Sequence, residues 1–129
     1  MAAPNLVNPT YIYSKTARYA VTASLASVLA NGAASGKVFK INSIFCANVD
    51  GTNAADISVS IYEGSMDSGT DRYLAKTITV PADATQIIST KETYFYLEEG
   101  DSIRALASAV SDGDTGTSLE LIIGYEEIS

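Results

Sequence analysis

The stretch KVFKINSIFCANVDGTNAADISVSIYEG, residues 37–64, decides the fold. Apolar and polar residues alternate in its first part and again in its last part, and the turn-like DGTN, residues 50–53, separates the two. Alternation with period two is typical of a strand that buries one face, and clusters of Gly, Asp and Asn are typical of turns. The stretch therefore predicts two successive strands separated by a turn.

The same alternation assigns side chains to faces. Those that we expect in the core are Phe39, Ile41, Phe45, Ala47 and Val49, followed by Ile57, Val59 and Ile61. Those that we expect on the outward faces are Lys40, Asn42 and Asn48, followed by Ser58, Ser60 and Tyr62.

Similar runs continue along the chain. Their expected inward residues are Leu74, Ile78 and Val80, then Ile103, Ala105, Ala107 and Ala109, and finally Leu119, Leu121, Ile123 and Tyr125. Short strands at regular intervals, without long helical patterns, indicate an all-β protein. We predict a single antiparallel β-sandwich of about eight strands, with jelly-roll or Greek-key-like connections.

Two segments are less regular. VTASLASVLA, residues 21–30, fits either a helix or a strand, and its neighbours favour a strand. Residues 1–10 contain Pro4 and Pro9 and show no periodicity. They predict an extended N-terminal arm with polyproline character, followed by a sandwich domain over residues 11–129. The first residues lack the basic and apolar regions of a signal peptide, and no apolar run is long enough for a membrane span.

The composition excludes several kinds of catalytic site. The chain has no His, and Cys46 is its only cysteine, within the apolar run SIFCANV, where we expect a buried and inert thiol. The stretch YLEEGDSIRALA, residues 96–107, contains three acids within four positions. Glu98 and Glu99 are adjacent, so in an extended chain they point to opposite faces, and Gly100 and Asp101 suit a turn. We therefore expect a polar turn there, no enzyme activity and no cofactor.

The acidic loops could bind calcium weakly. They are DSGTD, residues 67–71, and DGDTG, residues 112–116. Neither has the spacing of a calcium-binding loop, so we expect solvated loops and assign no metal site.

The charge is unevenly distributed along the sequence. Residues 1–49 contain four Lys or Arg and no acid, giving +4, whereas residues 50–129 contain four Lys or Arg against 15 acids, giving −11. The net charge of −7 argues against a nucleic-acid partner. The asymmetry suggests docking on an acidic surface with the acidic part facing outward.

Tyrosines beside the arm suggest a partner interface, since tyrosine offers a large contact area with a polar tip. The candidate interface residues are Pro4, Pro9, Tyr11, Tyr13, Lys15 and Arg18. For a glycan partner, the candidate platforms are Tyr62 and Tyr73, close to residues 67–71.

Four stretches together resemble one family of proteins. They are SGKVFKINSIFCANVDGTNAADISVSIYEG (35–64), LAKTITVPAD (74–83), YLEEGDSI (96–103) and GYEEIS (124–129). They look like small β-sandwich virion structural proteins of tailed, marine-type bacteriophages.

The resemblance implies a capsid decoration (cement) protein that is made in the host cytoplasm and binds the outside of the major capsid protein lattice. It also implies a homo-oligomer, such as a trimer, located on the capsid surface of the virion, without a nucleic-acid or membrane partner. A neck, tail or fibre component and a glycan-binding adhesion module remain alternatives.

Overall fold

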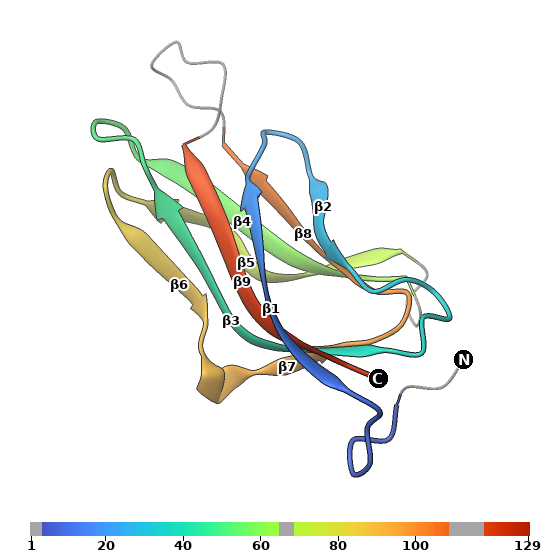
Figure 1. Ribbon diagram of the computed structural model, residues 1–129. Helices are drawn as coiled ribbons and strands as arrows, with labels where there is room; N and C mark the ends of the chain where they lie inside the picture. The colour runs from blue at the N-terminus through green and yellow to red at the C-terminus, as the bar shows by residue number, and fades with distance from the viewer. Residues whose placement is uncertain (1–3, 65–68, 109–117) are drawn as a thin grey trace.

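The computed structural model describes residues 4–64, 69–108 and 118–129 (Figure 1). Nine strands and one short 3-10 helix are found in these ranges. The strands are β1 (Ile12–Ala20), β2 (Ala26–Ala30), β3 (Val38–Asn48), β4 (Ala55–Glu63), β5 (Thr70–Val80), β6 (Thr85–Ser89), β7 (Phe95–Leu97), β8 (Ser102–Ala107) and β9 (Leu119–Ile128). The helix η1 (Lys91–Thr93) lies between β6 and β7.

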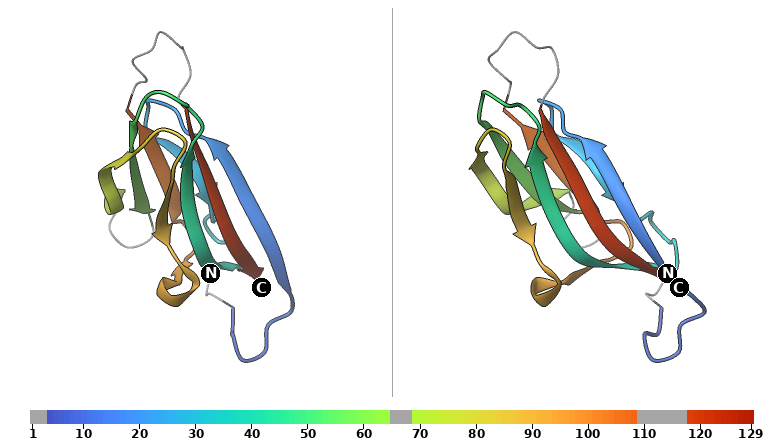
Figure 2. Two further views of the ribbon diagram at one scale, coloured as in Figure 1. Left: turned by 90° about the vertical axis from the view of Figure 1, so that its left-hand side faces the viewer. Right: turned by 60° about the vertical axis from the view of Figure 1, so that its left-hand side comes forward.

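The strands form two antiparallel sheets packed face to face (Figure 2). Sheet A has the order β1-β9-β3-β6, with β7 also paired to β3, and sheet B has the order β2-β8-β4-β5. If β6 and β7 count as one interrupted strand, the first strand pairs with the last, the second with the seventh, the third with the sixth and the fourth with the fifth. This nested pairing is the jelly-roll arrangement, and it confirms the predicted fold class.

The core lies between the sheets and is built from the inward residues of both. Its largest fully buried apolar side chains include Ile41, Ile44, Ile57, Leu97, Ile103, Leu119, Leu121 and Ile123. Each such side chain stabilises the fold by about 1.5–3 kcal/mol relative to leaving it in water. On β9 and β8 the predicted inward residues are buried, apart from the half-buried Tyr125 and from Ala109, which lies outside the described residues.

A β-bulge in β3 overturns part of the predicted pattern. Ile41 pairs with Tyr125 and Ser43 with Gly124, so Asn42 is an extra residue on β3. The buried positions therefore change from odd to even along the strand. The prediction for Phe39 and Ile41 is confirmed, whereas the inward placement of Phe45, Ala47 and Val49 and the outward placement of Asn48 are wrong. The side chains that replace them in the core are Ile44, Cys46 and Asn48.

Irregularities in β5 explain the other errors. The β4–β5 register shifts twice, and Thr77 has a positive φ of 52°. Leu74 and Ile78 are therefore exposed, contrary to prediction, whereas Val80 is buried. On β4, Ile57 and Val59 are buried as predicted and Ile61 is half-buried.

Ser58 and Ser60 are buried too, although they were predicted outside. Ser58 accepts a hydrogen bond from the Thr77 N–H, and Ser60 donates one to Asp71, so β5 supplies both partners.

The ambiguous segment 21–30 is a strand only in its second half, where β2 begins at Ala26. Its first half carries the chain from sheet A to sheet B, with Val21 buried and its N–H bonded to the Leu119 carbonyl oxygen. The acidic stretch at 98–101 forms the predicted turn. Gly100 has a φ of 85°, and the Asp101 N–H donates to the Glu98 carbonyl oxygen at 3.1 Å.

Two buried asparagine amides tie the sheets together at different ends of the sandwich. Asn31, which follows β2 of sheet B, donates from its Nδ2 to the carbonyl oxygens of Lys37 and of Leu97 in β7. Asn48, which ends β3 of sheet A, donates from its Nδ2 to those of Asn53 and of Val80 in β5. Each amide therefore satisfies one buried and one partly buried carbonyl group.

The thiol of Cys46 is fully buried, as expected from the sequence. Burial raises the pKa of Cys46 to about 11, because the charged thiolate is disfavoured away from water. The thiol form therefore predominates at neutral pH.

Candidate interaction surfaces

Residues 4–11 lie outside both sheets, at the end of the sandwich where the C-terminus also lies (Figure 1). Asn5 builds a turn there, since its carbonyl oxygen accepts the Asn8 N–H at 3.2 Å and its Oδ1 accepts the Val7 N–H at 2.9 Å. Leu6 and Val7 form the tip of this turn, and 47% and 92% of their surface is exposed. We call this pair the apolar tip.

The base of the N-terminal segment is fixed to the end of β9. Tyr11 and Ser129 exchange two backbone hydrogen bonds, each 3.1 Å long, and the Thr10 N–H also donates to the Ser129 carbonyl oxygen. The apolar tip is thus exposed on a turn whose base is tied to the sandwich.

Side chains reinforce this attachment around Glu127 of β9, which is buried. Its Oε1 accepts a hydrogen bond from Lys15 Nζ at 3.1 Å, and its Oε2 lies 3.4 Å from the Tyr11 hydroxyl and 3.5 Å from Lys37 Nζ. Burial alone would raise the pKa of Glu127, but the hydrogen bond and charge of Lys15, helped by Lys37, outweigh it and lower the pKa. The charge of Glu127 in turn raises the pKa of Lys37.

The Glu127→Gln variant should lose an acid-sensitive part of the stability. A carboxyl with a lowered folded-state pKa stabilises the fold above its ordinary value of 4.5, and the contribution disappears as the pH falls through the lowered value. We expect the variant to be about 1–2 kcal/mol less stable than the wild type at pH 7, because it loses charged hydrogen bonds, and we expect this deficit to be smaller at pH 3. Urea unfolding at both pH values measures the difference.

Glu92, which is exposed on η1, provides the matched control. Glu92→Gln should leave stability within about 0.5 kcal/mol of the wild type at both pH values. A deficit of Glu127→Gln that is the same at pH 3 and pH 7 would contradict the role of the charge.

The structure brings together only some of the predicted interface residues. The rings of Tyr11 and Tyr13 stack with centroids 4.4 Å apart, and Lys15 is bound to Glu127 beside them. Pro4 and Pro9 belong to the half-buried parts of the N-terminal segment. Arg18 lies apart, exposed on the outer face of sheet A. Residues that were not predicted are the apolar tip, Lys37 and Glu127.

The charge asymmetry of the sequence is largely lost in three dimensions. Strand β9 carries Glu120, Glu126 and Glu127 and pairs between β1 and β3, which carry basic residues. Lys15 and Lys37 therefore neutralise Glu127 within the same molecule. Arg18 forms no ion pair within the described part of the chain. Among Lys15, Arg18 and Lys37 it is therefore the residue most available to a partner.

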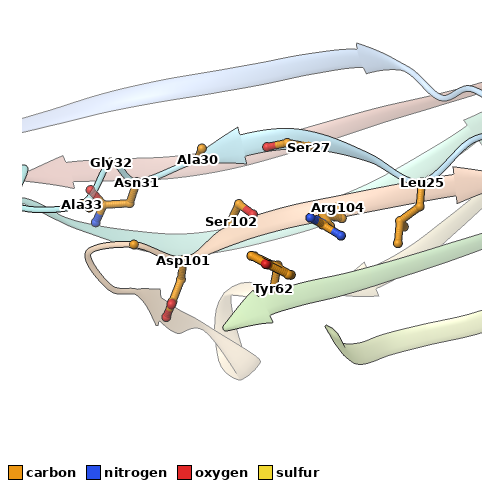
Figure 3. A pocket seen from close by; sticks show the side chains of 11 residues that line it. Leu25, Ser27, Ala30, Asn31, Gly32, Ala33, Tyr62, Asp101, Ser102 and Arg104 are labelled. Carbon is orange, nitrogen blue, oxygen red and sulfur yellow. The ribbon is translucent and has the colours of Figure 1, made fainter. Parts of the chain in front are cut away.

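A shallow concavity of about 350 Å³ lies on sheet B (Figure 3). Its lining includes Leu25 and Ser27 near β2, Ser102 and Arg104 on β8, and Tyr62 on β4. The Arg104 guanidinium lies 3.8 Å from the centroid of the Tyr62 ring and 3.2 Å from Asp71 Oδ2. The charged group of Arg104 and the ring of Tyr62 thus contact each other within this concavity.

Both tyrosines named as glycan platforms carry a cation over the ring. Arg104 covers one face of Tyr62, and Lys76 Nζ lies 4.1 Å from the centroid of the Tyr73 ring. A sugar would have to displace these cations to stack on the covered faces, so the geometry does not favour the glycan alternative.

Metal binding has no candidate in the part of the chain that the structure describes. No group of three or more Cys, Asp or Glu side chains gathers there. Residues 112–116 lie outside the described residues, as do residues 67 and 68 of the other acidic loop. Within the same described ranges, no helix has the length and apolar character needed to cross a membrane.

The outer face of sheet A carries an apolar row. Phe45 of β3 pairs with Ile122 of β9 on one side and with Ile87 of β6 on the other. Ile87 is 60% exposed, and Val49, just beyond β3, is 58% exposed. These two side chains are apolar, exposed and distant in sequence from the apolar tip.

Comparisons with known proteins reveal similarity of fold. No protein-family model and no curated protein matches the chain. A solved structure titled as Bacillus endospore appendages, a novel family of disulfide-linked pili, has a TM-score of 0.51 and 15% identity, covering 100% of this chain and 96% of that one.

Viral structures are also similar, though less closely. A chain of infectious bursal disease virus, Gx strain, has a TM-score of 0.49 and 14% identity over 92% of this chain and 31% of that one. A pentameric capsid protein from metagenomic phage sequences has a TM-score of 0.40 and 14% identity over 98% of this chain and 65% of that one. This chain thus spans about a third of the first viral protein and about two thirds of the second. At 15% identity, the similarity to the pilus protein shows only that the two chains share a fold, along the full length of this chain.

Proposed function

We propose that this protein is a non-enzymatic structural subunit of a bacteriophage virion, and that it decorates the outside of the major capsid protein lattice. The observation that carries the proposal is the apolar tip, Leu6 and Val7, exposed on a turn whose base is fixed to β9. A solvent-exposed apolar pair on a projecting turn is unfavourable in water, and a partner surface with a matching hollow would bury it.

The fixed base makes such an interaction efficient. Tyr11 is held by Ser129 and Glu127, and Asn5 holds the turn before it, so the described part of this segment is already shaped before binding. Less conformational entropy is then lost than for a fully mobile arm, and more of the burial energy appears as affinity.

The resemblance of the sequence to virion structural proteins supplies the partner class. A decoration protein is present in many copies, so modest stabilisation at each site adds up over the shell. A homo-oligomer would add avidity by binding several shell subunits at once. Because Lys15 is already paired with Glu127, we expect it to contribute little to electrostatic docking.

The number of copies per particle tests this function. We expect quantitative gels of purified virions, calibrated with the pure protein, to show hundreds of copies for a shell decoration protein. A dozen copies or fewer would instead identify a neck, tail or fibre component. Absence from purified virions would overturn the proposal altogether.

A further inference from the structure

Strand β1 is the most open edge among the described strands. In sheet A it pairs with β9 through nine consecutive residue pairs without a register shift, and no described strand lies on its other side. The remaining described edge strands are all interrupted or short: β2 has five residues and a register shift, β5 has two shifts, β6 has five residues, and β7 has three. Natural sheets usually blunt their edges in these ways, and β1 is the exception.

The hydrogen-bond pattern shows which residues face the open side. Tyr11 exchanges two bonds with Ser129, and the Val21 N–H donates to Leu119, so the odd residues of this stretch bond to β9. In an antiparallel pair, successive residues direct their backbone groups alternately toward the partner strand and away from it. The N–H and C=O groups of the even residues therefore point outward. These residues are Ile12, Ser14, Thr16, Arg18 and Ala20, all of them exposed.

We propose that β1 pairs with β1 of a second copy of this chain, antiparallel, about a two-fold axis at Thr16. This register joins outward-facing residues to outward-facing residues, as an antiparallel ladder requires: Ile12 to Ala20, Ser14 to Arg18, and Thr16 to itself. About ten backbone hydrogen bonds would form, and the two copies of sheet A would become one continuous sheet.

The side chains are complementary in this register. Lys15 faces Ala17, so no two cations are directly opposite, and the exposed Tyr13 faces Tyr19 of the second copy as an aromatic cross-strand pair. Arg18 faces the second copy's Ser14, and Ser14 is paired on its other side with Glu126. Arg18 and the second copy's Glu126 are therefore about 10 Å apart between backbones, with only a serine between them, and their side chains can bridge that distance.

The other possible occupants fit less well. The N-terminal segment of a second copy contains Pro4 and Pro9, which lack the N–H groups that a paired strand must donate. Pairing of β1 with β5 of another copy would meet the two register shifts of β5 and the unusual backbone at Thr77. Such head-to-tail pairing would also produce open-ended filaments, whereas the β1–β1 pair closes.

Sedimentation of the full-length protein over a dilution series tests the proposal. We expect a concentration-dependent species with twice the chain mass of 13.5 kDa. Arg18→Glu should weaken the dimer about tenfold, because the two-fold axis places two like-charge pairs in the interface. The double variant Arg18→Glu/Glu126→Arg should bring the dissociation constant back to within about threefold of the wild type.

Two further variants separate pairing from folding. Lys91→Glu changes the net charge equally on the exposed η1 helix and should leave dimerisation unchanged. Thr16→Pro removes only an outward N–H, which edge strands tolerate, and should weaken the dimer by about tenfold or more while the circular dichroism spectrum is kept.

A monomer at every concentration up to about 1 mM would overturn the proposal, as would open-ended polymers. An Arg18→Glu protein that dimerises like the wild type would overturn it too. These outcomes concern the isolated protein, so they are independent of whether it binds a capsid.

Discussion

Replacing Asn48 by Asp should cost about 3–5 kcal/mol of stability, although the two side chains have nearly the same shape. In the structure, Asn48 Nδ2 donates to the Asn53 and Val80 carbonyl oxygens, both at 3.0 Å, while its Oδ1 accepts the Asp50 N–H. A carboxylate cannot donate, so one buried and one partly buried carbonyl group would lose their partner and face a buried negative charge. With a total stability of 5–15 kcal/mol typical of domains, we expect a folded protein whose urea midpoint is lower by about 2 M.

Asn5→Asp is the matched control. Asn5 is exposed, and its side chain accepts the Val7 N–H, which a carboxylate does equally well. Its urea midpoint should stay within about 0.3 M of the wild type. Equal midpoints for the two variants would contradict the claim that the Asn48 amide joins sheet A to sheet B.

The sequence predicted the class of fold because alternation is a local property. Strand β9 contains no bulge, so its alternation is unbroken and the odd-numbered residues Leu119, Leu121 and Ile123 are all buried. On β3 the alternation predicts the wrong face after Asn42. From Ile44 to Ala47, both the odd-numbered and the even-numbered residues are apolar. Only the pairing with β9 decides which of the two sets is buried.

Polar burial was less predictable for a different reason. Ser58 and Ser60 look like outward residues, yet they are buried because Thr77 and Asp71 of β5 satisfy their hydroxyl groups. Asn48 was predicted outside for the same reason, and its partners come from two other segments. Which polar residues find partners depends on tertiary structure, which a single strand pattern does not contain.

The candidate interface was predicted only near the chain start. Tyr11, Tyr13 and Lys15 are close together in sequence and remain close in the structure. Glu127 could be placed beside Lys15 only with knowledge of the strand order, since the two are 112 residues apart. The apolar tip did have a local signal: Leu6 and Val7 stand between Asn5 and Asn8, two residues that favour turns.

Removing the apolar character of the tip should have the largest effect on attachment to particles. In the Leu6→Ser/Val7→Ser variant, two apolar side chains that a shell would bury become polar, while the Asn5 turn and the Tyr11–Glu127 contact remain. Burial of each side chain is worth about 1.5–3 kcal/mol, so binding to particles should weaken about 100-fold or more. The matched control, Val49→Ser/Ile87→Ser, replaces two other exposed apolar side chains.

Co-sedimentation of these proteins with phage particles that lack the endogenous copy tests whether the apolar tip attaches the protein to the capsid. We expect the wild type and the Val49→Ser/Ile87→Ser control to bind with similar affinity, and the Leu6→Ser/Val7→Ser protein, with unchanged urea stability, to remain in the supernatant. Binding by the Leu6→Ser/Val7→Ser protein at wild-type affinity would contradict this expectation.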